Sequence, residues 1–380
     1  MEMSFYKELP TSTERVFLRT DYNVPLKNGV VQDAYRIKKS EETIKTLFDK
    51  GISQIILATH IGRPDGREDV LSTRHIQETI KEEIGIKPYH VETLPPEPED
   101  IPSPNEEKLV LLENLRFHSE EIYNESGYAK KLARIADAYV NDAFGVSHRK
   151  HASVHAIKQY LPSYYGSLIK KELDIVEELH TVQQNLHLIL GGAKLASKLP
   201  VIKAMLPRAE KIYIAGTMMF PFYALKGYST GRTNVEEKSK ETAEEVAQNE
   251  KIELPKDVVV ANDRTNPTRI KNVAANNIPE DMEALDVGTK TIKSMKKHLK
   301  DAEYIVWNGP LGYYENSVFA KSTNELLRYL ANHDAKIIIG GGDTGNAVHE
   351  TQSDNDFYHV STGGGAFLKL LEKGRLPTLQ

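Results

Sequence analysis

The chain has 380 residues, more than one hydrophobic core usually holds, so we expect two domains. Charged residues make up 27% of the chain and the net charge is -5, which argues against a basic nucleic-acid binder or membrane-surface protein. With no cysteine, the chain has no disulfide, thiolate metal site or cysteine nucleophile. No apolar run approaches the ~20 residues of a membrane helix, and the first ten residues lack the apolar core of a signal peptide. We therefore expect a cytoplasmic protein that binds neither nucleic acid nor membrane.

Short apolar runs rich in Val, Ile and Leu recur along the first half and end abruptly in polar residues. Runs of this kind are typical of strands buried on both faces, and therefore of a parallel sheet in an α/β protein. They cover 15–23, 52–63, 108–117 and 137–145. The amphipathic segment 33–51 ends in a glycine and predicts a helix, while the proline-rich segment 95–107 predicts a surface loop.

The second half repeats the pattern, but its apolar runs end mostly in glycine. These runs cover 186–194, 211–218, 257–265, 304–312, 336–343 and 358–366. Segment 167–180 is amphipathic without a turn signal, so we expect it to be a helix that connects the two domains. The predicted fold is α/β, with two domains that are each a parallel-sheet, doubly wound, Rossmann-like α/β/α sandwich. The predicted boundaries are 1–166, 167–180, 181–362 and 363–380.

Ligands of open α/β sheets bind outside the carboxyl ends of the strands, so the residues after each run form the candidate site. In the first half these are Asp21, Asn23, His60, Arg63, Arg116 and Asp142. Arg36 and Arg149 lie close by in sequence. If these segments converge, the arginines would bind a small phosphorylated acid; the alternative for each is an ordinary surface arginine. His60, His148 and His151 are expected to be neutral and structural.

Gly340, Gly342 and Gly345 fit the G-x-G-x-x-G spacing of a dinucleotide site. A Rossmann unit places an acidic residue ~20 residues further on, whereas here the next strand ends in Ser361 and more glycine. No Walker A lysine follows either. The remaining interpretations are a tight turn without ligand, or a helix N-terminus that holds phosphate, with Asp343 available for magnesium.

Lys194 and Lys198 follow the glycine pair 191–192 and are four residues apart, so on a helix they would share a face. Two like charges on one face cost stability unless an anion lies between them, which favours a phosphate site over a solvated basic face. Segment 307–315 is compatible either with a rigid turn or with a turn lining a nucleotide, where Glu315 would accept from ribose hydroxyls.

Several long segments resemble, in order, the signature segments of the phosphoglycerate kinase family: RTDYNVPL, ATHIGRP, LLENLRFHSEE, YVNDAFGVSHRKHAS, LGGAKLASK, VWNGPLGYYE, IGGGDT and STGGGA. The resemblance implies two domains that face and close a cleft, and a monomer. It implies reversible phosphoryl transfer between 1,3-bisphosphoglycerate and ADP, giving 3-phosphoglycerate and ATP, with magnesium on the nucleotide. It also implies that segment 363–380 returns to the N-terminal domain.

The resemblance assigns the two substrate sites residue by residue. It assigns the phosphoglycerate site to Asp21, Asn23, Arg36, His60, Arg63, Arg116 and Arg149. It assigns the nucleotide site to Gly192, Lys194, Lys198, Gly216, Asn308, Pro310, Glu315, Gly340, Gly341, Gly342, Asp343 and Thr344, with Asp343 on the metal. The catalytic set is Arg36, Lys194, Lys198, Gly364 and Gly365. Ala215 and Thr217 stand where the family has glycine, Thr289 where proline is common, and 261–268 departs as well.

These residue types suit the chemistry. A carboxylate with a pKa of about 4 is already ionised at neutral pH, so its phosphorylation needs no general base. The transition state needs alignment and charge neutralisation, which cations and backbone N–H groups supply. Two alternatives remain open from the sequence: a Rossmann-type NAD-dependent dehydrogenase, and a catalytically weak nucleotide-binding protein of the same fold.

Overall fold

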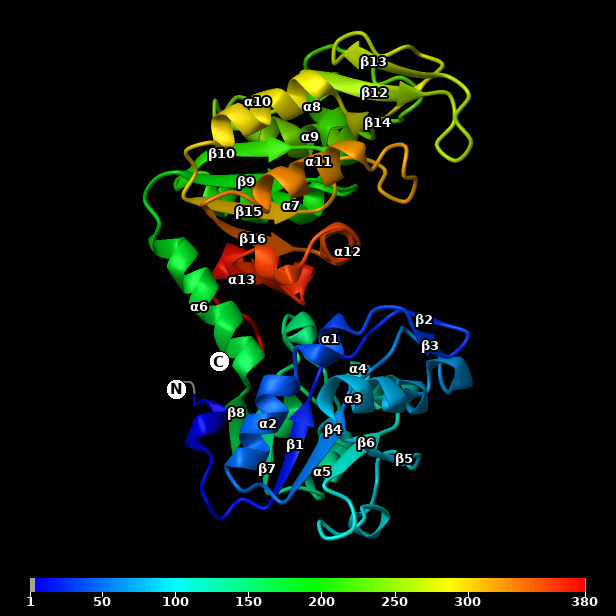
Figure 1. Cartoon of the computed structure of the whole chain (residues 1–380), viewed down its shortest axis with the longest axis vertical. Helices are drawn as coiled ribbons and strands as arrows, with labels where there is room; N and C mark the ends of the chain where they lie inside the picture. Colours follow the sequence, from blue (N-terminus) through cyan, green and yellow to red (C-terminus); the bar gives the residue numbers. More distant parts are fainter. Residues whose placement is uncertain (1–3, 380) are drawn as a thin grey trace. The chain divides into compact units, whose positions relative to one another are not determined.

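Two six-stranded parallel sheets organise the chain, one in each of its two units (Figure 1). In the computed structural model the first unit is Met1–Glu177 with Gly374–Gln380, and the second is Glu178–Lys373. The described residues are 4–379, so residues 1–3 and 380, at the ends of the first and last predicted segments, lie outside them. Both sheets are entirely parallel, and helices cover them, which confirms the predicted fold class.

The elements of the first unit follow the predicted alternation of strand and helix. Its strands are β1 (Arg15–Arg19), β2 (Leu26–Lys27), β3 (Val30–Val31), β4 (Gln54–Ala58), β5 (Tyr89–Val91), β6 (Leu109–Leu112), β7 (Ala138–Asn141) and β8 (Ser163–Tyr165). Its helices are α1 (Tyr35–Lys38), α2 (Glu41–Asp49), α3 (Gln77–Ile84), α4 (Ser119–Ile122), α5 (Ser126–Ala133) and α6 (Ser167–Thr181), the last of which continues into the second unit.

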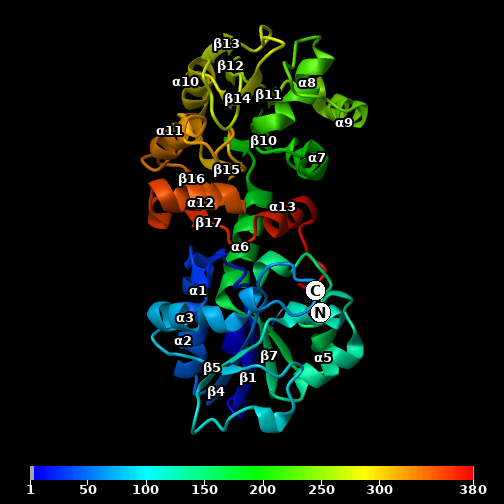
Figure 2. The same ribbon diagram turned by 90° about the vertical axis from the view of Figure 1, so that its right-hand side faces the viewer.

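The first sheet has the order β5-β6-β4-β1-β7-β8 and is covered on both faces. Alternate residues of a strand point to opposite faces. Val16 and Leu18 join a core with residues of α1, α2 and α3, whereas Phe17 joins a core with residues of α5. Figure 2 shows these helices on the two sides of the sheet. The continuous apolar runs were therefore read correctly as doubly covered strands, although the short edge strands β5 and β8 were missed.

The single helix predicted over 33–51 is wrong, because the chain forms α1 and α2 with a break at Ser40. The Ser40 hydroxyl donates to the carbonyl oxygen of Ile37 at 2.7 Å. A serine that bonds to nearby backbone competes with the helical hydrogen bonds, which explains the break. Gly51 has a φ of 89° just after α2, the left-handed end that its position predicted.

The second unit contains nine strands and seven helices among the described residues. Its strands are β9 (Leu186–Leu190), β10 (Ala209–Ile214), β11 (Ile252–Glu253), β12 (Asp257–Ala261), β13 (Ile270–Ala274), β14 (Glu283–Val287), β15 (Tyr304–Asn308), β16 (Lys336–Gly340) and β17 (His359–Val360). Its helices are α7 (Leu195–Met205), α8 (Met219–Leu225), α9 (Glu237–Ala247), α10 (Thr289–Leu299), α11 (Lys321–Leu330), α12 (Gly342–Thr351) and α13 (Gly364–Lys373).

The second parallel sheet has the order β11-β10-β9-β15-β16-β17. Figure 2 shows α10, α11 and α12 on one side of it and α7 and α13 on the other. The strand predicted over 257–265 forms as β12, but it was wrongly expected in the parallel sheet. It is instead the centre of an antiparallel sheet of order β13-β12-β14. Its partner β13 is largely exposed. Because an exposed strand needs no apolar run, the sequence pattern did not indicate this strand.

Helix α6 begins against a buried carboxylate of the first sheet. Asp142 Oδ1 accepts the backbone N–H groups of Leu168 and Ile169 at 3.0 and 3.3 Å, and its Oδ2 accepts the Thr43 hydroxyl at 2.6 Å. A Cβ on Gly166 would lie 2.3 Å from this carboxylate, so only glycine lets the two approach. Asp142, noted in the sequence as a strand-end residue, is therefore the N-terminal cap of α6.

The last residues of the chain are part of the first unit. The carbonyl oxygen of Thr378 accepts from Lys158 Nζ and Tyr165 Oη, both at 3.1 Å, and the Thr378 hydroxyl donates to Ser147 O at 2.8 Å. Of the predicted segment 363–380, only the part from Gly374 onward belongs to the first unit, whereas α13 belongs to the second. None of the helices in residues 4–379 combines the length and apolarity that a membrane crossing requires.

Asp142→Asn tests the charge of this cap. Burial raises the pKa of Asp142 to about 7, although the Thr43 hydroxyl and two N–H groups oppose the rise. A carboxyl whose pKa is raised by folding stabilises the folded chain at low pH, and this contribution is lost as the pH rises through 7. Relative to Asp142→Asn, the wild-type free energy of unfolding should fall by about 3 kcal/mol between pH 5 and pH 7.5, measured by urea denaturation.

Asp174→Asn is the matched control for this measurement. It makes the same change at an exposed position of α6, where the Asp174 carboxylate pairs with Lys170 at 2.8 Å. Its difference from the wild type should stay within about 0.5 kcal/mol at both pH values. A pH-independent difference between the wild type and Asp142→Asn would show that the carboxyl group does not titrate in this range.

Candidate functional site

Three predicted residues contact one another at the carboxyl end of the first sheet. Arg36 Nη1 donates to Asp21 Oδ2 at 3.0 Å, and His60 Nε2 lies 3.8 Å from Asp21 Oδ1. Asp21 and His60 are buried, while 27% of the Arg36 side chain remains exposed. Burial, reinforced by the charge of Arg19, holds the pKa of His60 well below its usual value of 6.5. The ring is therefore neutral at pH 7, as the sequence analysis expected.

Arg19, at the end of β1, is a site residue that the sequence analysis missed. Its side chain is fully buried, with Nε donating to Ser153 Oγ at 2.7 Å and Nη2 lying 3.3 Å from His60 Nδ1. Because arginine can only donate, this contact makes Nδ1 the acceptor and places the ring proton on Nε2, toward Asp21. Glu121 Oε1 lies 3.8 Å from Arg19 Nη2 and supplies the buried counter-charge. An arginine ending an otherwise apolar strand was the available signal.

Gly62 is held from both sides by predicted site residues. Asn23 Oδ1 accepts the Gly62 N–H at 2.8 Å, and Arg116 Nη1 donates to the Gly62 carbonyl oxygen at 2.6 Å. Burial, with the neighbouring charges of Arg19 and Arg149, lowers the pKa of Arg116 to about 10, so the guanidinium remains charged at neutral pH. Asn23 and Arg116 thus belong to one hydrogen-bonded frame.

Arg63 and Arg149 make no direct contact with the other predicted residues of this unit. Arg63 is exposed and forms no hydrogen bond or ion pair within residues 4–379. Arg149 is half-buried, and its Nε donates to His148 Nε2 at 3.1 Å. Burial lowers the pKa of His151 to about 3, so this ring is also neutral. The first unit therefore offers a cationic site whose two outer arginines are available to a ligand.

Backbone meets backbone at the carboxyl end of the second sheet. A Cβ on Gly191, after β9, would lie 2.0 Å from the Pro310 carbonyl oxygen, after β15. Gly216, after β10, has a φ of 61°, and its Cβ would lie 2.6 Å from Gly192 N. Only glycine fits such contacts, so the recurring strand-end glycines form a close backbone frame. This agrees with the predicted close approach of backbone at these ends.

Lys198 lies in the first turn of α7 with its ammonium group inside this frame. Its Nζ donates to the carbonyl oxygens of Gly191 and Asn308 at 2.5 and 2.8 Å. Burial lowers the pKa of Lys198 to about 8, and the charge of Asp343 opposes the decrease. A buried ammonium held by neutral carbonyls lacks a full counter-charge, which an anionic ligand would provide.

Lys194 departs from the predicted arrangement. The helix begins at Leu195, and Lys194 is its N-terminal cap in an extended conformation, with φ -115° and ψ 93°. Its side chain is exposed and has no hydrogen bond to another described residue. The expectation that Lys194 and Lys198 share a helix face is therefore wrong, because the turn at the preceding glycines delays the helix by one residue.

The first turns of α12 and α13 lie side by side. A Cβ on Gly364 would lie 2.2 Å from Gly341 Cα, and the Asn308 amide also borders Gly341. The first N–H groups of a helix have no partner within it, and the helix dipole makes that end positive. Two such ends together suit an anion. The buried Thr344 hydroxyl accepts the Gly309 N–H at 2.7 Å and so braces the frame from within.

A pocket of about 350 Å³ opens over these strand ends. The predicted nucleotide-site residues that line it are Gly192, Gly216, Pro310, Glu315 and Asp343. The apolar side chains of Met219, Leu285 and Leu311 form part of its wall. An apolar wall beside a glycine frame and carboxylates that include Glu315 and Asp343 fits a flat ring attached to hydroxyl and phosphate groups.

The sequence analysis missed the charged rim of this pocket. Glu283 lies between two arginines, 3.0 Å from Arg264 Nη2 and 3.3 Å from Arg232 Nη2, and all three side chains line the pocket. Glu283 begins β14, and the two arginines lie in loops before it; Arg264 stands in the predicted run 257–265 but was not singled out as a site residue. Thr217, one of the departures from the family pattern, also lines the pocket and donates to Ala193 O at 3.2 Å.

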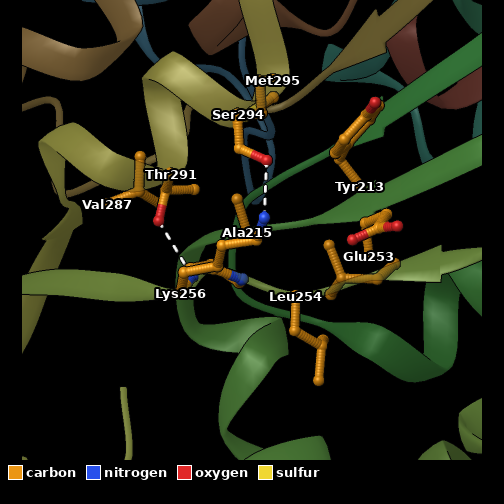
Figure 3. Close-up of a pocket in the computed structure, with 11 residues that line it drawn as sticks. Tyr213, Ala215, Glu253, Leu254, Lys256, Val287, Thr291, Ser294 and Met295 are labelled. Atoms are coloured by element: carbon orange, nitrogen blue, oxygen red, sulfur yellow. Dashed lines mark hydrogen bonds between the residues drawn. The ribbon is translucent and has the colours of Figure 1, made fainter. Parts of the chain in front are cut away.

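Ala215, the other departure, is buried and borders a much smaller hollow (Figure 3). There Lys256 Nζ donates to Ser294 Oγ at 2.8 Å, and the Lys256 N–H donates to Thr291 Oγ1 at 2.9 Å. The hollow measures about 20 Å³, room for about one water molecule. It is therefore too small for a ligand.

Asp343 is the carboxylate available to a metal ion. Among the described residues no group of three or more His, Asp or Glu side chains is arranged to hold a metal on its own. A carboxylate at helix starts that suit an anion would nevertheless fit magnesium, which commonly takes one or two protein carboxylates and completes its shell with substrate phosphates and water.

Comparison with known proteins gives a consistent result over almost the whole chain. A family model described as "Phosphoglycerate kinase" matches residues 6–374. A phosphoglycerate kinase from Dictyoglomus turgidum is 40% identical over 376 residues, covering 96% of this chain and 94% of the relative. A cytosolic phosphoglycerate kinase from Nicotiana tabacum is 39% identical, covering 98% and 96%.

Solved structures agree. A crystal structure of phosphoglycerate kinase from Pyrococcus horikoshii matches with a TM-score of 0.88 at 27% identity, covering 99% of this chain and 98% of that one. A phosphoglycerate kinase from Coxiella burnetii matches with a TM-score of 0.83 at 28% identity, covering 100% and 98%.

Gly364→Ala and Gly365→Ala form a matched pair that tests the contact between helix starts. At position 364 the added methyl would collide with Gly341 backbone, whereas at 365 it meets nothing within 4 Å. We expect Gly364→Ala to lower the free energy of unfolding by about 2 kcal/mol or more. Gly365→Ala should be neutral or stabilising by about 0.5 kcal/mol, because alanine favours a helix. Equal urea midpoints for the two variants would contradict this packing.

Proposed function

We propose, since the chain belongs to the phosphoglycerate kinase family, that its first unit binds the phosphorylated acid and its second unit binds the nucleotide. The family reaction is reversible phosphoryl transfer between 1,3-bisphosphoglycerate and ADP, which gives 3-phosphoglycerate and ATP in glycolysis. The chain is accordingly a phosphotransferase with a carboxyl group as acceptor.

The position of Lys198 supports the nucleotide assignment most directly. Its buried ammonium donates to Gly191 O and Asn308 O, and the charge of Asp343 acts on it. Phosphate oxygens placed here would neutralise the ammonium and would also meet the N–H groups at the starts of α12 and α13. In this proposal the apolar wall of the pocket takes the base, Glu315 takes the ribose, and Asp343 takes magnesium.

The first unit suits a small polyanion. Arg36, Arg63 and Arg149 offer guanidinium groups to its phosphate and carboxylate, while Asn23 and Arg116 hold the backbone beside them. Burial keeps His60 and His151 neutral, so neither is a positive charge nor a strong base at neutral pH. This agrees with a reaction in which the acceptor carboxylate needs no proton removed.

Charge neutralisation is then the main catalytic task. We propose that Arg36, Lys194, Lys198 and the N–H groups of Gly364 and Gly365 contact the transferred phosphoryl group. Magnesium, when bound through the nucleotide phosphates, adds charge to the same centre. The predicted hinge in the connecting segment 167–180 and the predicted monomer remain part of this proposal, as does a cytoplasmic location, which the cytosolic tobacco relative supports.

Neither alternative function gains support. The strand after the glycine motif, β17, is followed by Ser361 and Thr362 rather than by the acid that would bind an NAD ribose. A catalytically weak binding protein of the same fold would keep this cation as well, and the assay described next separates it from an active kinase.

A coupled assay of ATP-dependent phosphorylation of 3-phosphoglycerate tests the activity. The wild type should turn over, and Lys198→Ala and Arg36→Ala should each lower kcat at least about 100-fold, because each removes a charge from the transition state. Lys203→Ala is the control, since Lys203 lies exposed on the same helix as Lys198 and pairs with Glu245. Full activity in Lys198→Ala would exclude the proposed mechanism.

The pH dependence of ADP binding gives a second test. Free Lys198, with a pKa lowered to about 8, loses its charge between pH 7 and pH 9, whereas bound phosphates would keep the ammonium charged. ADP affinity should therefore fall about tenfold over this range, with proton uptake on binding near pH 8, measured by calorimetry in two buffers. Lys198→Arg should abolish the proton uptake, and unchanged uptake in that variant would assign it to another group.

A further inference from the structure

An exposed loop, residues 62–71, interrupts the compact first unit between β4 and α3. It begins at Gly62, whose backbone Asn23 and Arg116 hold, and it carries the exposed Arg63. Such a loop is mobile unless its ends are fixed. Both of its ends contact two consecutive buried residues that follow β6, Glu113 and Asn114.

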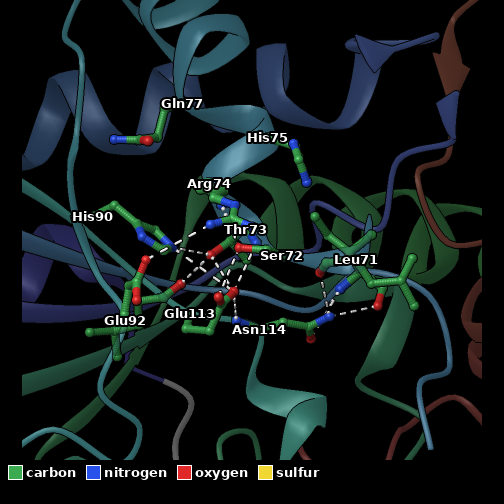
Figure 4. Close-up of polar contacts among 12 residues, drawn as sticks. Leu71, Ser72, Thr73, Arg74, His75, Gln77, His90, Glu92, Glu113 and Asn114 are labelled. Carbon is green, nitrogen blue, oxygen red and sulfur yellow. Dashed lines mark hydrogen bonds and ion pairs between the residues drawn. The ribbon is translucent and has the colours of Figure 1, made fainter. Parts of the chain in front are cut away.

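Glu113 fixes the C-terminal end of the loop (Figure 4). Its side chain is 1% exposed, and its Oε2 accepts the Ser72 hydroxyl at 2.8 Å. Its Oε1 accepts the Thr73 N–H at 2.9 Å and the N–H of Asn114 at 2.7 Å. Arg67 Nη2 lies 3.9 Å from Oε2 and His90 Nε2 lies 3.9 Å from Oε1, both beyond hydrogen-bond distance, so neutral donors satisfy the carboxylate.

Asn114 fixes the N-terminal end. Its Nδ2 donates to the carbonyl oxygens of Ile61 and Leu71 at 2.8 and 2.9 Å. One amide group therefore joins the residue just before the loop to the last residue of the loop. Its Oδ1 accepts the N–H of Arg116 at 3.1 Å. The same residue therefore places the backbone of a site arginine.

Substitution at Glu113 should change these contacts in a defined way. Glutamine has the same shape but keeps only one acceptor oxygen. Its NH₂ group would face either the Ser72 hydroxyl, whose own proton then lacks an acceptor, or the N–H groups of Thr73 and Asn114, which can only donate. At least one buried donor then loses its partner, which costs more than the hydrogen bond contributed. The lost hydrogen bond affects Ser72 or Thr73, which follow the C-terminal end of the loop.

We propose that Glu113 and Asn114 are positioning residues for the phosphorylated acid. They close loop 62–71 at both ends and so fix Gly62, Arg63 and Arg116 without touching the substrate. This inference rests on the proposed function of the first unit. Because the nucleotide pocket lies in the other unit, the effect is selective for one substrate.

The experiment compares Glu113→Gln with Glu92→Gln in the coupled assay. Glu92 is 61% exposed and lies 3.8 Å from Arg67, so its substitution makes the same charge change beside the same loop without freeing a buried donor. In Glu113→Gln the KM for 3-phosphoglycerate should rise about tenfold, with the KM for ATP and kcat unchanged within twofold. Glu92→Gln should match the wild type.

If Glu113→Gln folds poorly, a second variant, Ser72→Ala, and a second measurement, amide hydrogen exchange, still test the proposal. Ser72→Ala removes one donor to the carboxylate and should raise the KM for 3-phosphoglycerate by a smaller factor in the same direction. Amide exchange in 62–73 should be faster in both variants than in Glu92→Gln. The proposal is overturned if the KM for 3-phosphoglycerate stays within twofold of the wild type, or if both KM values change together. A wild type without activity would instead refute the proposed function.

Discussion

The close approach of backbone to backbone at the carboxyl edge of the second sheet is the constraint on which the site depends. Gly191 leaves no room for a side chain against the Pro310 carbonyl, and Gly364 leaves none against Gly341. The strand ends and helix starts are thereby brought close enough for Lys198 to reach two carbonyl oxygens. A larger residue at these positions would separate the elements, and the cation would lose its place.

In the proposed function the two units bind anions in opposite ways. The first uses charged side chains, some of them held by polar partners, as Arg19 is by Ser153 and Arg116 by Gly62. The second uses backbone dipoles and a single buried ammonium. Side-chain guanidinium groups suit a small ligand with fixed phosphate and carboxylate geometry, whereas backbone N–H groups follow a phosphate chain closely.

Much of this could be predicted from the sequence, because apolar runs and strand-end residues are local patterns. Asp21 and His60 lie together since parallel strands bring their ends to one edge, and Arg36 reaches Asp21 from α1. Arg19 and Glu113 were missed, because an ionised residue next to an apolar run signals a candidate site but does not show whether it will be buried with a partner. Lys194 does not share a helix face with Lys198, since the turn at Gly192, with a φ of 90°, is a tertiary feature. β13 was missed because it lacks a buried face.

The return of the last residues to the first unit has a consequence for how the chain is made. Thr378 donates to Ser147 O and accepts from Lys158 and Tyr165, so the first unit remains incomplete until residues 374–380 are translated. The second unit is continuous in sequence and its residues all leave the ribosome earlier. Domains generally fold as units from the N-terminus during synthesis. In this chain the order of completion is reversed, and the N-terminal unit is the last to gain all of its native contacts.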